Sequence, residues 1–536
     1  MPMKYFEPRF SRTLAVLSTL LVAGAFRTTA ADTTPPPAPV NLRVLQLGPT
    51  PNRVSLQWNA VTDTGGSGLK EYILYRDGLE VGRNTSPVVV DTYLLAGHTY
   101  SFRAAAVDNA TNTSLLSTSL VVTALPAAPV AGTKSVKALL LRFPDWPDAP
   151  YTTNYANDVI FNNPFSVKKF FEEVSYGRLT LQGDSEGWYT LPFPSSNYCT
   201  FTLNGGLWYG CNTAQMLNDA LSVIPNSARI GTNDVVILLI HGMGTVGLSG
   251  GKYKYIAATN GFFVDVVAHE IGHDFNATQH AAGLDACSRY PVGPKLFTLG
   301  SEGCFLGRYT DGYDTMAAGN SYHFNMFLKE KMGFLVPSNI QTVTHDGDYV
   351  LHMAETPTNA VQMIKLPLGN EMFYFLEYRT MTGFDGPGTP TPGGNPGPID
   401  GVLVHLRPSI YPGTDADTIR PRITLNPGTP FIDPYRHLLV EVTQKLTNRV
   451  VVRISGLNQP FQITDLQRAG AGGQDARLTF NTIAGARYAV QSSSNLQTWL
   501  TVKTNILAAG PATTNTVPGA GTNTRSFFRL GVDPIR

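Results

Sequence analysis

The stretch that most constrains this chain is Val264–His280, which contains the pattern H-E-x-x-H at His269, Glu270 and His273. Residues at i and i+4 lie on one face of an α-helix, so the two imidazoles can share one metal ion. Glu270, beside the first of them, is placed to act as general base toward a water on that ion. We therefore predict a metal-bearing helix over 262–275. Hydrolytic zinc needs about three protein ligands, so a third must come from elsewhere.

Length and composition set the frame for this helix. A chain of 536 residues exceeds one hydrophobic core and predicts several domains. Hydrophobic residues make up 43% and charged residues 15%, with 51 glycines and 38 prolines, which indicates a folded, turn-rich and β-rich protein. The 40 basic and 39 acidic residues nearly balance, so no electrostatic footprint for nucleic acid or an anionic membrane is expected.

The first 30 residues read as an export signal. Lys4, Arg9 and Arg12 precede an apolar run over 14–26, which is too short to span a bilayer, and small residues follow at the end. A retained anchor is the alternative. No later stretch is long and apolar enough to cross a membrane. We expect a secreted protein, located outside the cell, in a periplasm or at a cell surface.

Cysteine usage agrees with export. The chain contains Cys199, Cys211, Cys287 and Cys304. An even number in an exported chain predicts two disulfides, and Cys199–Cys211 with Cys287–Cys304 is the simplest of the three pairings.

Residues 33–125 predict a β-sandwich, because short strands alternate with turn signals. The segment resembles a fibronectin type III module, with Trp58 as the core tryptophan, Tyr100 as the late-strand tyrosine and Asp77-Gly78 as a hairpin turn. Residues 340–456 return to strands after the helix-containing segment, and residues 457–536 predict a C-terminal β module.

Residues 134–338 interleave helices and strands around the H-E-x-x-H motif and resemble a metzincin-type peptidase domain. Metzincins extend the motif to H-E-x-x-H-x-x-G-x-x-H and place a methionine in a turn beneath the metal. Here Asn276 stands where the glycine belongs, and Met316 lies in the turn-like stretch 309–319. The stretches 170–179 and 323–335 are similar to secreted gametolysin-like metallopeptidases. The resemblance implies a multidomain protein with an α+β zincin/metzincin-like catalytic domain over 134–338, flanked by all-β sandwich modules.

The third ligand implied by this resemblance is His280, one residue beyond the family position. Asn tolerates the left-handed backbone that the turn requires. Two alternatives stay open: a supporting His280 with Asp285 or a water completing the site, or no metal at all. Asp274 is either an orienting partner of a ligand imidazole or a solvated helix residue. His241 and His323 are either hydrogen-bond donors to an oxyanion or structural histidines.

The function implied by the resemblance is that of a secreted zinc endopeptidase. His269, His273 and His280 would hold one Zn²⁺, and Glu270 would assist attack by water on protein or peptide substrates. The β modules would contact matrix, cell wall or polysaccharide. Asp-rich turns offer oxygens to Ca²⁺, but no spacing requires a calcium site. The alternatives are a non-catalytic secreted adhesin or binding protein built on a degenerate zincin domain, and a metal-dependent hydrolase acting on something other than peptides.

Overall fold

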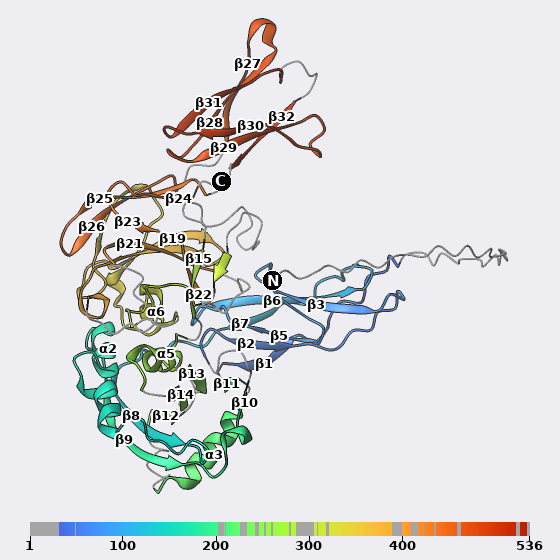
Figure 1. The fold of residues 1–536 in the computed structure, drawn as a ribbon. Coiled ribbons are helices and arrows are strands. Elements are labelled where there is room, and N and C mark those ends of the chain that lie inside the picture. Colours follow the sequence, from blue (N-terminus) through green and yellow to red (C-terminus); the bar gives the residue numbers. More distant parts are fainter. Residues whose placement is uncertain are drawn as a thin grey trace, which may run out of the picture.

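The structure is a computed structural model that describes most of the chain. The described residues are 32–48, 50–201, 208–209, 211–225, 233–241, 246–250, 253–258, 261–277, 280–285, 305–307, 309–317, 321–387, 399–408, 416–421, 423–433, 436–457, 462–520 and 526–532. The predicted export signal (1–30), Cys287 and Cys304 lie outside them. The predicted multidomain, predominantly β architecture is confirmed (Figure 1). No helix in the described part of the chain is long and apolar enough to span a membrane.

The first module is a two-sheet β-sandwich. Its strands are β1 (Arg43–Leu47), β2 (Val54–Gln57), β3 (Leu69–Arg76), β4 (Leu79–Asn84), β5 (Val88–Asp91), β6 (Thr99–Asp108) and β7 (Leu120–Thr123). The sheet orders are β1-β2-β5 and β4-β3-β6-β7. Trp58 is buried in the core and packs edge-on against Tyr72 at 5.5 Å between ring centroids. The Tyr100 hydroxyl accepts a hydrogen bond from the backbone N–H of Leu95, as a late-strand tyrosine does in such sandwiches.

The middle module is a mixed five-stranded sheet covered by helices on both faces. Its strands are β8 (Gly132–Arg142), β9 (Leu179–Thr190), β12 (Val235–His241), β13 (Val246–Gly250) and β14 (Tyr253–Ala258). Its helices are α1 (Thr153–Asn157), α2 (Val167–Val174), α3 (Thr213–Val223), α5 (Val264–Asp274) and α6 (Met326–Lys331). Neighbours in the order β14-β12-β8-β9 are parallel, and β13 joins the β14 edge antiparallel.

Burial on both faces of this sheet explains the continuous apolar strands, as is usual for parallel sheets. Strand β12 is buried at every position. Alternate side chains of β8 and β12 pack with α2 and α5 on one face and with α3 on the other. The predicted Cys199–Cys211 disulfide is present beside the α3 core.

The trailing module packs two sheets around a second core. The strands of the larger sheet are β15 (His280–Asp285), β16 (Phe305–Gly307), β17 (Ile340–Thr342), β19 (Met363–Gly369), β20 (Met372–Arg379), β21 (Gly401–Arg407), β22 (Ala416–Pro421) and β23 (Thr424–Leu425). Those of the smaller sheet are β18 (Gly347–His352), β24 (Phe431–Asp433), β25 (Leu438–Lys445) and β26 (Arg449–Ser455). The larger sheet runs β16-β15-β22-β21-β20-β19-β17, with β23 on β21. It therefore includes two strands from the N-terminal side of the predicted boundary near residue 339.

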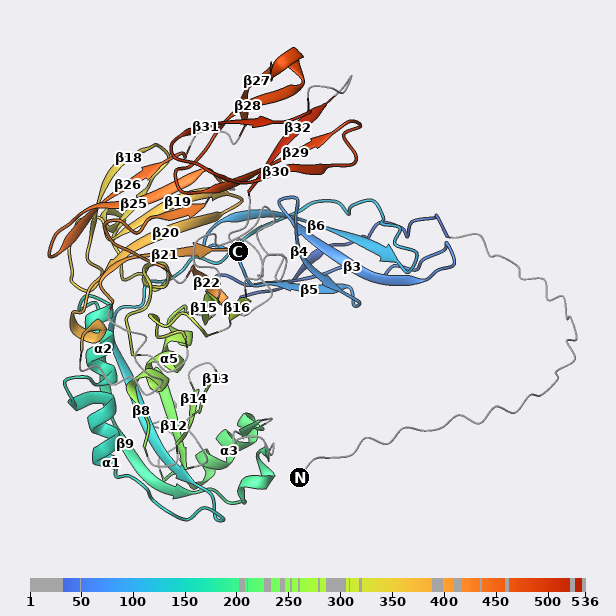
Figure 2. The same ribbon diagram turned by 45° about the horizontal axis from the view of Figure 1, so that its top comes forward.

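The last module, at the top of Figure 2, consists of two three-stranded sheets with a small core between them. Its strands are β27 (Ile463–Ala469), β28 (Asp475–Asn481), β29 (Arg487–Ser493), β30 (Leu500–Leu507), β31 (Ala512–Val517) and β32 (Phe527–Val532).

A buried charge cluster joins the middle and trailing modules. Arg379, at the end of β20, is fully buried and contacts three buried carboxylates. The partners are Glu355 at 3.8 Å, Glu377 at 3.1 Å and Asp385 at 2.5 Å. These carboxylates also accept backbone N–H groups: Glu377 caps the start of α6 at Met326. The cluster therefore ties the trailing sheet to α6, the helix that follows the H-E-x-x-H segment in the chain.

The first module also contacts the trailing module. Glu371, in the turn between β19 and β20, accepts hydrogen bonds from the Tyr100 hydroxyl at 2.8 and 3.0 Å and lies 2.8 Å from His98 Nδ1. Arg407 donates to the carbonyl oxygens of Glu371 and Tyr93. These contacts place the first module against the trailing sheet (Figures 1 and 2).

Candidate metal centre

Helix α5 carries the H-E-x-x-H motif where the sequence predicts it. Its apolar face, including Val267, Ala268 and Ile271, is buried in the middle-module core. Asp265 lies in the first turn, where a carboxylate complements the helix dipole. Because this face packs in the core, His269 and His273 lie together on the other face of the helix, where both are half-buried.

The helix ends in the turn that the third histidine requires. Asn276 has φ +73°, in the left-handed region that Asn adopts more readily than most residues. The backbone N–H of Ala277 returns to the carbonyl of Gly272, which closes the helix end. The chain then reaches His280, the first residue of β15, which is buried.

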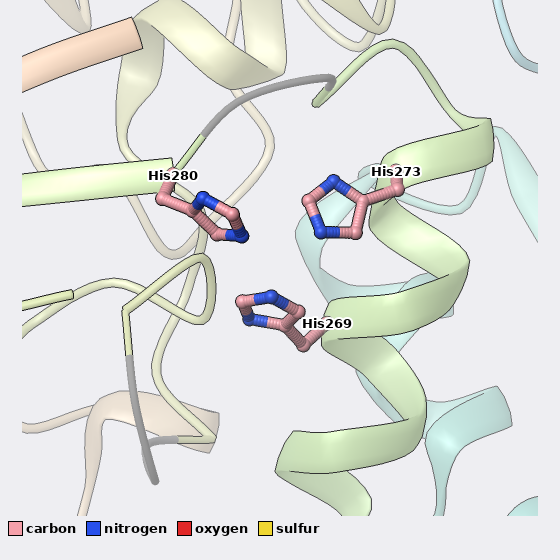
Figure 3. Close-up of side chains that lie close together, drawn as sticks. All are labelled: His269, His273 and His280. Carbon is pink, nitrogen blue, oxygen red and sulfur yellow. The ribbon is translucent and has the colours of Figure 1, made fainter. Parts of the chain in front are cut away.

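The structure brings His269, His273 and His280 together (Figure 3). One ring nitrogen from each lies within 4.8 Å of the others, and the ring centroids are 4.9, 5.0 and 5.3 Å apart. Three imidazoles bound to one ion at about 2.0–2.1 Å have nitrogens about 3.4 Å apart in tetrahedral geometry. The arrangement fits a divalent metal with small adjustments of the rings.

Backbone carbonyls orient two of the imidazoles. His269 Nδ1 donates to the Thr315 carbonyl and His273 Nδ1 to the Ala277 carbonyl, both at 2.9 Å. The ring proton therefore lies on Nδ1, and Nε2 is the nitrogen with the lone pair that a metal ion takes in protein metal sites. Burial, reinforced by the neighbouring His269 and His280, lowers the pKa of His273 to about 3, so the ring is neutral and able to ligate.

Glu270 is buried beside the histidines. Its Oε2 has no hydrogen-bond partner among the described residues. Burial raises the pKa of its carboxyl to about 7; the nearby Lys254 opposes this shift and Asp274 adds to it. Asp274 itself pairs with the buried Lys254 at 2.7 Å, whereas backbone carbonyls take the Nδ1 atoms of His269 and His273.

Met316 lies under the helix in a tight turn. It is fully buried, its N–H donates to Asp314 at 2.6 Å, and its carbonyl accepts from Ala281 of β15. A Cβ on Gly272 would lie 3.0 Å from Met316 Sδ, so the glycine makes room for the sulfur. The turn therefore contacts both elements that carry the histidines.

Tyr309 is a site residue that the sequence reasoning missed. Its ring centroid lies 4.1 Å from that of His280 and 6.1 Å from that of His269. Its φ of +60° is unusual for a bulky residue and often marks a functional constraint. The only sequence feature that could have pointed to Tyr309 as a site residue was its position in the stretch before Met316. No motif spacing identifies it.

The other candidates have structural partners. His323 is buried between Glu173 at 2.7 Å and Lys329 at 2.9 Å. His241 packs against Trp146 at 5.5 Å between ring centroids. The side chain of Asp285, the alternative third ligand, lies outside the described part of the structure.

Comparison with known proteins gives partial matches. No family model matches the chain. It is 45% identical over 95 residues to Exoglucanase B of Cellulomonas fimi, covering 18% of this chain and 8% of that protein. It is 33% identical over 154 residues to Chitinase Chi52 of Paenibacillus xylanexedens (29% and 28%), and 40% identical over 91 residues to Chitinase D of Niallia circulans (17% and 17%). The chain thus spans less than a third of the length of these curated relatives.

Solved structures match over short segments too. Chitinase ChiA74 from Bacillus thuringiensis is 30% identical with a TM-score of 0.16, covering 18% of this chain and 14% of that one. An Fn3-like protein from Clostridium thermocellum is 25% identical with a TM-score of 0.14, covering 16% and 92%.

These relatives overturn the predicted identity and activity. The expectation of a gametolysin-like, metzincin-type zinc endopeptidase acting on protein substrates is wrong, because the curated relatives are an exoglucanase and two chitinases. The finer assignment of the middle module as a zincin catalytic domain gains no support from them. The prediction of a peptide substrate failed because the site residues do not determine the substrate. Three imidazoles and a carboxylate indicate that the site can bind a metal ion, whereas the bond that is cut depends on the surrounding loops. The peptide substrate came from the resemblance alone.

Proposed function

We propose that the chain is an exported, polysaccharide-associated modular protein whose β modules contact the polysaccharide and which holds one Zn²⁺ between the middle and trailing modules at His269, His273 and His280. The proposed association with polysaccharide rests on the 45% identity over 95 residues to an exoglucanase, and two chitinase matches support it. The matched lengths are those of one or two β modules. This proposal follows the second of the predicted classes, a secreted binding protein.

The proposed zinc site rests on the geometry of the three histidines. Their nitrogens converge within 4.8 Å, and two rings are held through Nδ1 by backbone carbonyls. Three imidazoles suit zinc better than the hard cations Ca²⁺ and Mg²⁺, which take oxygen ligands. In a purely binding protein this ion is structural and joins α5 to β15.

A second candidate function is metal-dependent hydrolysis of a non-peptide bond in or on the polysaccharide. Glu270 favours it, because a buried carboxylate oxygen without a partner beside a metal triad has no structural role in the described residues. A zinc ion held by three imidazoles keeps an open position and acts as a Lewis acid there. Oε2 of Glu270 would accept a proton from a water at that position.

Two measurements test the proposal. Retention on insoluble chitin and cellulose is measured by depletion from solution, with silica particles as the control surface. Zinc per purified chain is measured by mass spectrometry for the wild type, His280→Ala and Glu270→Gln. We expect retention on at least one polysaccharide, about one zinc in the wild type and in Glu270→Gln, and zinc loss in His280→Ala. Retention no greater than on silica would overturn the polysaccharide role, and a zinc-free wild type would overturn the metal centre.

The second candidate has its own test. Soluble products released from chitin and glucans are compared between the wild type and Glu270→Gln. Release by the wild type alone supports hydrolysis at this site. Equal release, or none from either protein, contradicts it.

A further inference from the structure

The histidine triad is divided between two structural units. His269 and His273 belong to α5, whereas His280 begins β15, a strand of the trailing module's larger sheet. Strand β15 pairs in parallel with β22, with His280 opposite Ala416 and Ala281 opposite Thr418. The register shifts between His280 and Ala281, so the ladder is irregular at the histidine itself.

Strand β22 also holds the loop on the other side of His280. Asp311 is fully buried, and its carboxylate lies 2.5 Å from Arg420 Nε of β22 and 3.0 Å from His405 Nε2 of β21. Thr310 Oγ1 accepts the N–H of Gly283 on β15 at 3.0 Å and lies 3.2 Å from its carbonyl. Tyr309, which directly precedes Thr310, places its ring against His280.

The Met316 turn is attached to the same strand. Asp314 accepts the N–H groups of Met316 and Asn325 at 2.6 and 2.7 Å. The Asn325 amide donates to Thr418 Oγ1 of β22 at 3.0 Å. The segment 309–311 and the Met316 turn both lie near the α5 histidines. Hydrogen bonds thus connect both of them to β22.

We infer that β22 completes the proposed metal centre and that Arg420 is a positioning residue for it, acting through Asp311, Tyr309 and His280. This inference rests on the proposed metal site. The trailing module is then part of the site: it sets where the third histidine stands relative to the two on α5. Supporting groups of this kind change metal affinity by about 10–100-fold when removed.

The test uses the full chain and compares Arg420→Gln, Arg420→Lys and Thr310→Val with the wild type. Arg453→Gln is the matched control, because Arg453 lies on β26 of the same module and forms an exposed ion pair with Asp348. Zinc affinity is measured by competition with a chromophoric chelator, and the visible spectrum of the Co²⁺-loaded protein reports ligand geometry. Chitin or cellulose retention reports the β modules independently.

We expect Arg420→Gln to weaken zinc affinity by about 10–100-fold and to alter the Co²⁺ spectrum. Arg420→Lys, which keeps the charge, should recover part of the affinity, and Arg453→Gln should match the wild type. If Arg420→Gln does not fold, Thr310→Val decides, because it keeps side-chain volume and removes the hydroxyl that bonds Gly283 of β15. Wild-type affinity and spectrum in both Arg420→Gln and Thr310→Val would overturn the inference while leaving the metal centre intact. A wild type that binds no zinc would overturn the metal centre and this inference together.

Discussion

Replacement of Arg379 by methionine should destabilise the junction between the middle and trailing modules strongly. Arg379 is fully buried and lies within 2.5–3.8 Å of Asp385, Glu377 and Glu355. Methionine fills much of the same volume but removes the charge and every donor of the guanidinium. Three buried carboxyl groups then face one another without their common cation.

The cost can be sized from the contacts. Removing one partner of a buried ion pair costs about 3–5 kcal/mol, because an uncompensated charge is left in the interior. Burial opposes ionisation of Asp385, but the charge of Arg379 lowers the pKa of that carboxyl, so most of its stabilisation depends on the arginine. Burial, with the nearby Asp385, raises the pKa of Glu355, so that group adds less repulsion. We expect a loss of about 3–5 kcal/mol in unfolding free energy.

The assay is differential scanning calorimetry combined with urea unfolding of the full chain, read at the transition that includes these two modules. The control is Arg453→Met, which breaks an ion pair whose side chains are 51% and 47% exposed. Exposed pairs contribute about 0–1 kcal/mol. A loss below about 1 kcal/mol for Arg379→Met, or one equal to that of the control, would refute the reasoning that this cluster stabilises the junction.

His280→Ala should lose the stabilisation by zinc, which for the wild type is about 2.7 kcal/mol at a free zinc concentration 100-fold above Kd. The measurement is the thermal unfolding temperature of each protein with and without zinc. A zinc-induced shift in the variant equal to that of the wild type would argue against ligation by His280. Burial raises the pKa of Glu270 above its unfolded value, so its contribution to stability is present below pH 4.5 and lost as the pH rises through about 7. Metal-free Glu270→Gln should therefore be more stable than the metal-free wild type at pH 8, by no more than about 3 kcal/mol, and show no advantage at pH 4; chemical denaturation at both values checks the sign. Trp58→Ala should cost the first sandwich about 3–5 kcal/mol, because the ring is 1% exposed, and a near-neutral effect on its unfolding transition would contradict the assigned core.

Local rules predicted the parts of the site that lie close together in sequence. The spacing of His269 and His273 placed both on one face of a helix, and the tolerance of Asn276 for positive φ allowed the turn that now brings His280 back. The alternation of strands and the position of Trp58 were enough to predict the first sandwich.

Long-range pairing was beyond the same rules. Nothing in the residues of β15 indicates that it pairs with β22, because a short apolar strand fits many partners. Tyr309 reaches the site through that pairing and not through a motif. Glu377 and Asp385 lie two and six residues from Arg379, but nothing in the sequence indicates that these charges are buried together with the more distant Glu355. The substrate class depends on the loops around the site, and it was predicted only from the family resemblance. That prediction, a peptide substrate, was wrong.

The pairing of β15 with β22 has a consequence for when the metal can be acquired. Until residues 416–421 have been synthesised, β15 lacks its β22 partner, and His280 is not yet held by that pairing opposite the two histidines of α5. A two-ligand half-site binds metal weakly, and metal binding is coupled to completion of the fold. Contacts between residues distant in sequence form slowly, so the centre closes late. The ion held at the proposed centre would therefore be set by the metals present where folding ends, and not by those present where the chain is made.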